Sequence, residues 1–316
     1  MNRGTSRLTP REVSVLMSIR ERQRTMKSIA QGLNIPQPEL TRLVRSLRTK
    51  GFVVVERQGM SSSVSISNQK HASRLRRVLD EFSHMKLEKI LSLTSLEVLS
   101  ALASSPGSSR SEIMSASCVS ARSLHTALKR LRELGVVRTR ARRVYEMSER
   151  FEPLAEFVRE FDDYSNQEEA KEFCRDAMVI WQRGREFIIR TECVSETSEF
   201  RLTAFSVFEM YGVPLFLRWK HYYHPVRRWR RTIDEVLLQS MLLRPRDARD
   251  NTAILMLWHN NHMSRDLDRL RKGASRYGLQ NDLEAVANYF IDPERNRPPG
   301  FPKMDELKEK MRSGTP

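Results

Sequence analysis

The sequence LTRLVRSLRTKGFV at residues 40–53 decides the fold, because a similar sequence, LHTALKRLRELGVV, follows at residues 124–137. An offset of 84 residues aligns the two stretches, and five positions of the first have identical counterparts in the second: Leu40, Leu47, Arg48, Gly51 and Val53. Upstream, residues 8–13 resemble residues 93–98 at an offset of 85. Ordered similarity of this kind predicts two copies of one small domain in a single chain.

The first copy has the pattern of three helices followed by two strands. Thr9 is a candidate helix cap with Pro10 at the first helical position, and a short helix is expected over residues 26–33. A longer helix with one apolar stripe ends at Gly51, the residue type expected in a left-handed C-terminal cap. Two strands within residues 52–67 complete the copy.

The second copy repeats this order of predicted elements. Helices are expected over residues 95–104 and 110–117, and Ser120 caps a third helix that ends at Gly135. A hairpin is expected over residues 136–147. The two copies therefore share one predicted architecture.

Three helices followed by a hairpin resemble the winged helix-turn-helix of MarR- and ArsR-like prokaryotic DNA-binding regulators. The motifs that carry the resemblance are PQPELTRLV at residues 36–44 and SARSLHTALKRL at residues 120–131, with Gly-Phe-Val and Gly-Val-Val entries to the hairpins. The resemblance covers about residues 8–67 and 93–148, under half of the chain. It implies two winged-helix domains. Winged helices also bind RNA or proteins, so the fold alone does not specify DNA.

The charge of the chain is distributed unevenly. The 316 residues include 55 Lys and Arg against 39 Asp and Glu, a net charge of +16. Residues 1–150 hold 28 basic and 12 acidic side chains and therefore carry all of this charge, whereas residues 151–316 sum to zero. Such asymmetry predicts a half that binds a polyanion, joined to a half with another task. The alternative is a face of solvated arginines without a ligand.

A helix in the major groove presents the side chains of its first two turns to the base edges. The residues predicted to contact bases are Gln37, Thr41 and Arg42 in the first copy and Ser120, Arg122 and Thr126 in the second. Predicted phosphate contacts are Arg45, Arg48, Lys129 and Arg132, and Arg57 and His125 complete the expected DNA face of the helices and the first hairpin. The second hairpin adds Arg140, Arg142 and Arg143. Because the first hairpin is rich in Ser, we expect the second to contribute more electrostatically.

The predicted fold class is mainly α with small β-hairpins, in two winged-helix domains, plus a C-terminal α+β domain. The expected domains are a first winged helix at residues 1–70, a linker helix at 71–92, a second winged helix at 93–150, an acidic linker helix at 151–172, an α+β domain at 173–291 and a Pro-rich mobile tail at 292–316. The acidic helix is a candidate mask for the basic DNA face.

Three motifs in the C-terminal half resemble the corresponding domain of AbiEi-type antitoxin regulators: LTAF at residues 202–205, YGVP at 211–214 and DEVLL at 234–238. Those regulators also place a winged helix in front of this domain. The resemblance implies that residues 173–291 bind a partner protein. The chain departs from the family pattern because the typical Thr-Gly at the start of the first motif is Leu-Thr, and because a second winged helix is added.

Two His-x-x-His pairs, His221 with His224 and His259 with His262, are the candidate metal ligands. On a strand the first pair points to opposite faces, and no cysteine stands near either pair. The sequence has no phosphate-binding loop, nucleophile elbow or dinucleotide fingerprint, so we expect no metal, no cofactor and no catalysis. The basic aromatic run at residues 219–231 either stacks bases or is a strand edge that leads into a loop.

Cys118, Cys174 and Cys193 are odd in number and widely spaced, so they predict neither a disulfide framework nor a zinc site, as in a reducing cytoplasm. No apolar stretch approaches the length of a membrane span, and residues 1–24 lack the apolar core of a signal peptide. We expect a cytoplasmic transcription regulator that binds double-stranded DNA sequence-specifically and does not bind membranes, with homodimerisation as a further option. The alternative is an antitoxin-like regulator whose C-terminal domain binds a partner protein.

Overall fold

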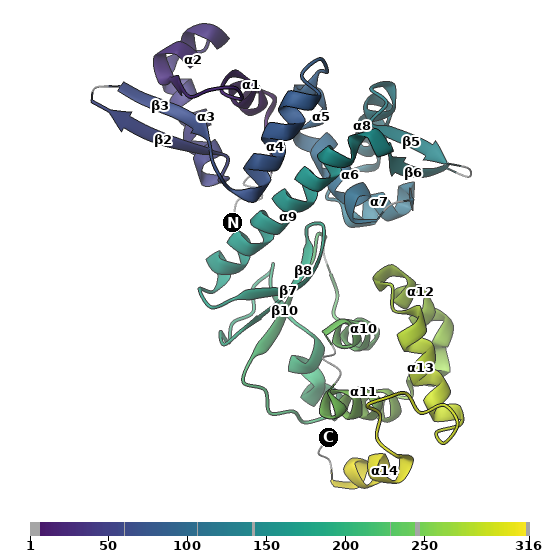
Figure 1. The fold of residues 1–316 in the computed structure, drawn as a ribbon. Coiled ribbons are helices and arrows are strands. Elements are labelled where there is room, and N and C mark those ends of the chain that lie inside the picture. Colours follow the sequence, from purple (N-terminus) through teal and green to yellow (C-terminus); the bar gives the residue numbers. More distant parts are fainter. Residues whose placement is uncertain are drawn as a thin grey trace. The chain divides into compact units, whose positions relative to one another are not determined.

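The computed structural model describes residues 7–59, 61–105, 107–140, 143–227, 229–243 and 247–313 (Figure 1). The chain forms two compact units. Unit 1 comprises Met1–Glu169 with Arg183–Glu186, and unit 2 comprises Ala170–Gln182 with Phe187–Pro316. The structure is mainly helical with small antiparallel sheets of three and four strands, which confirms the coarse fold class predicted from the sequence.

The first repeat (residues 8–67) contains three helices and a three-stranded sheet. Its elements are α1 (Pro10–Ser18), β1 (Arg24–Thr25), α2 (Met26–Leu33), α3 (Gln37–Thr49), β2 (Val53–Gln58) and β3 (Ser61–Ile66). The sheet order is β1-β3-β2, so the short strand before α2 pairs with the returning strand of the hairpin. The first helices and the hairpin are thereby held in one small domain.

The second repeat (residues 93–148) has the same element order. Its elements are α6 (Leu93–Ser104), β4 (Ser108–Ser109), α7 (Arg110–Ala116), α8 (Ala121–Glu133), β5 (Val137–Arg140) and β6 (Val144–Met147). The sheet order β4-β6-β5 matches that of the first repeat, strand for strand. Two segments with related sequences have therefore folded into related structures.

Local signals explain where these helices begin and end. Thr9 accepts a hydrogen bond from the backbone of Glu12, whose carboxylate accepts one from the backbone of Thr9, which is a capping box. Ser120 caps α8 through the backbone of Ser123. Gly51 and Gly135 follow α3 and α8 with φ of +72° and +68°, a left-handed conformation that strains other residues.

The segments expected as linkers are helical but differ from the expected bounds. Residues 71–92, expected as one helix, contain α4 (Lys70–Glu81) and α5 (Leu87–Ile90). The acidic segment after the second repeat begins with η2 (Glu149–Phe151) and continues as α9 (Glu152–Phe173).

Aromatic packing makes these segments part of the core of unit 1. The ring centroids of Phe82 and Phe151 lie 4.8 Å apart, which joins the end of α4 to the start of α9. The rings of Phe161 on α9 and Phe52 in the first repeat lie 4.9 Å apart. One continuous buried core therefore extends through both repeats and through α4, α5 and α9.

Unit 2 combines a four-stranded sheet with helices. Its strands, in the order β7-β8-β10-β9, are β7 (Met178–Arg183), β8 (Glu186–Thr191), β10 (Lys220–His224) and β9 (Arg201–Leu202). Its helices are η3 (Ala204–Tyr211), α10 (Ile233–Leu243), α11 (Ala248–Asn260), η4 (Met263–Asp266), α12 (Leu267–Tyr277), α13 (Gln280–Ile291) and α14 (Met304–Ser313). Between the α-helices, Gly273 on α12 packs so closely that an added Cβ would lie 2.6 Å from Leu238 on α10.

The C-terminal segment differs from the expected mobile tail. Phe301 and Leu307 are buried in the core of unit 2, and α14 packs against α11. The hydroxyl of Tyr289 donates to the carbonyl of Pro302 at 3.1 Å, and the side chain of Asn251 donates to the carbonyl of Gly300 at 3.0 Å. These contacts hold the segment against the helices of unit 2. Among the described residues, no helix is long and apolar enough to cross a membrane.

Candidate nucleic-acid interface

Helix α3 separates an apolar face from a polar one. Its buried side chains are Leu40, Val44 and Leu47, and its exposed ones include the predicted DNA contacts Gln37, Thr41, Arg42, Arg45 and Arg48. The hydroxyl of Thr41 donates to the carbonyl of Gln37 at 2.9 Å, which leaves its oxygen free to accept a further hydrogen bond. Within the described residues, no carboxylate forms an ion pair with Arg42, Arg45 or Arg48. The helix thus presents three uncompensated guanidinium groups on one exposed surface.

Helix α8 has a similar division. Leu124, Leu128 and Leu131 are buried, whereas the predicted contacts Ser120, Arg122, His125, Thr126, Lys129 and Arg132 are exposed. The Oγ atom of Ser120 accepts from the backbone of Ser123 at 3.2 Å and lies 3.0 Å from the hydroxyl of Ser123. Ser120 therefore already acts as a helix cap, and a base contact by its side chain competes with that role.

The two hairpins differ from the electrostatic expectation. In the second, Arg138 Nε lies 2.6 Å from Glu146 Oε1, and Arg140 Nη1 lies 3.5 Å from Glu146 Oε2. One carboxylate thus pairs with Arg140, which was among the arginines that favoured this hairpin, and with the neighbouring Arg138. Arg143 is exposed, and Arg142 lies outside the described residues. In the first hairpin, Arg57 is exposed and pairs across the strands with Ser62.

Among the described residues, Glu156 and Glu160 of the acidic helix α9 form ion pairs with the linker helix α4 and not with α3 or α8. Glu156 pairs with Arg74 at 2.9 Å and with Arg77 at 3.7 Å, and Glu160 pairs with Lys70 at 3.2 Å. All three basic residues belong to α4. The acidic helix therefore compensates the basic linker helix, and the hypothesis that it masks the DNA face gains no support from these pairs.

The histidine pairs do not form a metal site. His221 Nδ1 lies 3.2 Å from Ser206 Oγ, whereas the ring of His224 stacks on Phe187 with centroids 4.6 Å apart, so the two face opposite sides of β10. Burial, with the positive charge of Arg190 beside it, lowers the pKa of His221 to about 4. Across the described residues, the single cluster with metal-ligand geometry contains no histidine.

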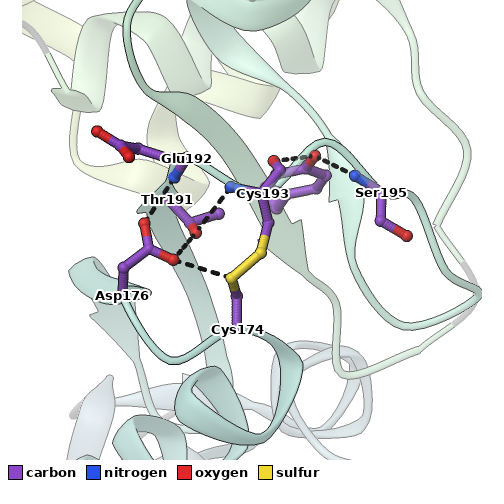
Figure 2. Close-up of a disulfide and its surroundings, with 7 residues drawn as sticks. Cys174, Asp176, Thr191, Glu192, Cys193 and Ser195 are labelled. Carbon is purple, nitrogen blue, oxygen red and sulfur yellow. Dashed lines mark hydrogen bonds between the residues drawn. A yellow bond between two sulfur atoms is a disulfide. The ribbon is translucent and has the colours of Figure 1, made fainter.

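That cluster is Cys174, Asp176 and Cys193, in which the two cysteines form a disulfide (Figure 2). The expectation of no disulfide was wrong, and with it the cysteine argument for a reducing compartment. Cys174 follows the end of α9 and Cys193 follows β8, so the fold brings together two residues that lie 19 positions apart. A carboxylate oxygen of Asp176 lies 2.8 Å from the Cys174 sulfur.

The carboxylate of Asp176 is fixed by its neighbours (Figure 2). Its two oxygens accept hydrogen bonds from the backbone of Glu192 and the hydroxyl of Thr191, each at 2.7 Å. These bonds lower the pKa of Asp176. The charged carboxylate therefore remains beside the disulfide at neutral pH. Widely spaced cysteines carry no signal for this arrangement, because it depends on how a helix end meets a strand end.

The first part of the basic aromatic run, residues 220–224, forms the core strand β10. Tyr222 and Tyr223 on β10 are buried, and the ring of Tyr223 contacts that of Trp229 with centroids 4.9 Å apart. Trp219 is partly exposed, with the guanidinium groups of Arg218 and Arg190 at 5.0 and 5.6 Å from its ring centroid. The strand interpretation accounts for residues 220–224, and the buried rings of Tyr222 and Tyr223 cannot stack on bases.

Comparison of the chain with family models, with curated proteins and with solved structures gives no significant match.

Proposed function

We propose that the two repeats are winged-helix domains and that the chain is a prokaryotic transcription regulator that binds duplex DNA sequence-specifically without catalysis. The observation that carries the proposal is the exposed basic face of α3, with its three guanidinium groups that have no acidic partner among the described residues. Helix α8 follows the same plan in a second domain with the same strand order. The cytoplasmic location remains part of this proposal.

The side chains on these helices fit the two kinds of contact that DNA requires. Gln and Arg side chains make paired hydrogen bonds to adenine and guanine, so Gln37 and Arg42 suit base contacts at the start of α3. Arg45 and Arg48 lie further along the helix and suit phosphates, where each cation releases a bound counterion. Lys129 and Arg132 occupy the corresponding turns of α8. Binding should therefore weaken steeply as the salt concentration rises.

The test is the salt dependence of binding to a mixed-sequence duplex, measured by fluorescence anisotropy. Removing three phosphate or base contacts in the variant Arg42→Ala, Arg45→Ala, Arg48→Ala should lower the slope of log K against log salt by about 2 to 3. The matched control is Arg295→Ala, Arg297→Ala, Lys308→Ala, which removes three exposed charges from unit 2. Equal slopes for the wild type and the α3 variant would refute the proposal.

For unit 2 we propose a protein-binding role, either with a second copy of the chain or, as in an antitoxin-like regulator, with a different partner protein. The observation that favours it is the exposure of large apolar side chains: Phe216 is 92% exposed and Met210 is 69% exposed. Phe and Met are among the residue types that are enriched in protein interfaces relative to the rest of the surface. Sedimentation velocity of the wild type and of Phe216→Ser, Met210→Ser tests the first option. A concentration-dependent dimer that both changes leave intact would exclude these residues from the interface.

A further inference from the structure

The two DNA-facing helices differ at some positions and agree at others. At the offset of 84 residues, Arg45 corresponds to Lys129, and Arg48 corresponds to Arg132. The cations placed for phosphate contacts are thus present in both repeats.

The positions at the start of the two helices, in contrast, carry different side chains. Residues 36–42 have the sequence PQPELTR, and their counterparts at residues 120–126 have the sequence SARSLHT. Leu40 and its counterpart Leu124 are identical and buried, whereas the exposed positions predicted to contact bases differ in chemistry from their counterparts. Two surfaces with like phosphate contacts and unlike base contacts bind DNA in like poses and select different bases.

The arrangement of the repeats within unit 1 bears on how the two sites lie along the DNA. Leu8 and Leu93 are counterparts at the offset of 85, and the backbone N–H of Leu93 donates to the carbonyl of Leu8 at 2.9 Å. A residue meets its own counterpart near an axis of rotation, whereas repeats stacked head to tail join unlike surfaces. Within unit 1, the β2–β3 and β5–β6 hairpins project away from each other at opposite ends (Figure 1). Both observations indicate that an approximate twofold axis relates the two repeats.

The relation between the repeats is held by packing. The aromatic contacts of α4 and α9 belong to the same buried core as both repeats. Arg7 of the segment before α1 also forms an ion pair with Glu97 on α6. A shared core fixes the separation and orientation of α3 and α8, which a flexible linker would not do.

We infer that one chain binds one inverted repeat in DNA whose two half-sites differ in sequence. This inference rests on the proposed DNA-binding function and specifies its substrate. A dimer of identical chains reads identical half-sites because its symmetry requires it. In this chain the symmetry is approximate, so the phosphate contacts are paired and the base contacts are not. If unit 2 dimerises the chain, each protomer brings its own unsymmetrical repeat.

The first experiment is selection of bound duplexes from a random-sequence pool with the full chain. The expected result is one motif with two unlike half-sites in inverted orientation, their centres about 10 base pairs apart or a multiple of this helical repeat. Sedimentation of the selected duplex should show one chain per inverted repeat. Half-sites in direct orientation, or two chains on one inverted repeat, would overturn the inference while leaving DNA binding intact.

The second experiment exchanges the reading residues. Replacing residues 36–42 with the sequence of residues 120–126 keeps Leu40, the buried residue of the segment, and alters exposed or partly exposed positions. The selected motif should become a symmetrical inverted repeat of the half-site bound by α8. The control is Lys308→Arg, a conservative change at an exposed position of unit 2, which should leave the motif unsymmetrical.

The outcomes separate the inference from the function on which it rests. An exchanged variant that folds, binds DNA and still selects two unlike half-sites overturns the inference alone. A pool that yields no enriched sequence, from a protein whose DNA binding does not depend on salt, overturns the proposed function and the inference with it. Far-ultraviolet circular dichroism of the exchanged variant establishes that the chain has kept its overall helical content.

Discussion

The two repeats hold the end of their third helix in different ways. In the first, the Nζ atom of buried Lys50 lies 2.7 and 2.9 Å from the two carboxylate oxygens of buried Glu12. The same Nζ donates to the carbonyl of Arg7 at 2.6 Å, and the hydroxyl of Ser46 donates to Glu12 at 2.7 Å. In the second repeat, the counterpart of Lys50 is Leu134, which packs against the shared apolar core.

The comparison shows that one position of the repeat can hold either a lysine in a fully hydrogen-bonded ion pair or an apolar side chain. A buried ion pair contributes little net stability, because the desolvation of both charges offsets their attraction. A buried charge without its partner is strongly destabilising. The first repeat is therefore expected to be the more sensitive to a single substitution at this position.

The largest expected effect is the loss of one partner from this pair. Lys50→Met leaves the Glu12 carboxylate buried without its cation, which should lower the free energy of unfolding by about 3–5 kcal/mol. The counterpart change Leu134→Met conserves volume and should cost less than about 1.5 kcal/mol. Urea unfolding followed by circular dichroism measures both. Equal losses in the two variants would remove the distinction between the repeats.

A double variant sharpens the same comparison. Lys50→Met together with Glu12→Gln removes both charges and makes position 50 apolar, as its counterpart Leu134 is in the second repeat, while Gln keeps the side-chain oxygen that accepts from the backbone of Thr9. Because no unpaired charge remains, most of the stability lost in the single variant should return. A double variant as unstable as the single one would show that the position needs the ion pair itself.

The next effect concerns the glycines that follow α3 and α8. A Cβ at Gly51 would lie 2.7 Å from the ring of Tyr164, whereas one at Gly135 would meet the end of the flexible Arg150 side chain at 2.7 Å. Both positions have positive φ, so Ala costs about 1 kcal/mol or more at each. Displacing the tyrosine ring should add about 1–3 kcal/mol at Gly51 alone. Thermal unfolding of Gly51→Ala and Gly135→Ala tests the order, which a less stable Gly135→Ala would reverse.

The repeats also differ in the buried titratable group beside each. Against the first repeat, His71 Nε2 lies 3.0 Å from the carbonyl of Lys50, and burial lowers the pKa of His71 to about 4. Against the second, Asp162 accepts a hydrogen bond from Ser100 at 2.6 Å, and burial raises the pKa of Asp162 to about 6. The two shifts affect stability with opposite signs.

Between pH 6.5 and 4 the unfolded chain protonates His71 and the folded chain does not, so stability is lost as the pH falls through this window. The folded chain instead keeps Asp162 protonated from pH 3.8 to 6, so the stability from Asp162 is lost as the pH rises through 6. Each contribution is about 3 kcal/mol. The free energy of unfolding, measured with urea across this range, should rise more steeply with pH in Asp162→Asn than in the wild type. In His71→Gln it should rise less steeply than in the wild type. Identical pH profiles for these variants would contradict the assignment.

The parts of the fold that the sequence predicts well are those with local causes. Thr9 and Gly51 mark helix ends because capping and positive φ depend on a few neighbouring residues. The disulfide between Cys174 and Cys193 was missed because it depends on tertiary packing. Phe301 was missed in the same way, since its burial depends on helices distant in the sequence.

The candidate interface divides along the same line. The exposed face of α3 follows from helical periodicity, because the buried Leu40, Val44 and Leu47 determine which side chains point outward. The reduced positive charge of the second hairpin cannot be predicted from the sequence pattern. Its arginines were counted without Glu146, whose position opposite Arg138 depends on the register between β5 and β6.

The smallest expected effect tests this correction on the hairpins. Glu146→Gln removes the carboxylate that compensates Arg138 and Arg140 and should increase DNA affinity by about threefold, with a steeper salt dependence. The exposed change Glu294→Gln in unit 2 alters the net charge equally and should leave both quantities unchanged. Anisotropy titrations at several salt concentrations measure the difference. The gain is small because the two guanidinium groups are already half exposed or more, so solvent screens the pairs that the substitution breaks. If Glu146→Gln left the affinity unchanged while Arg57→Ala lowered it, the first hairpin would be the one that contacts DNA, and the charge count of the second would have no bearing on binding.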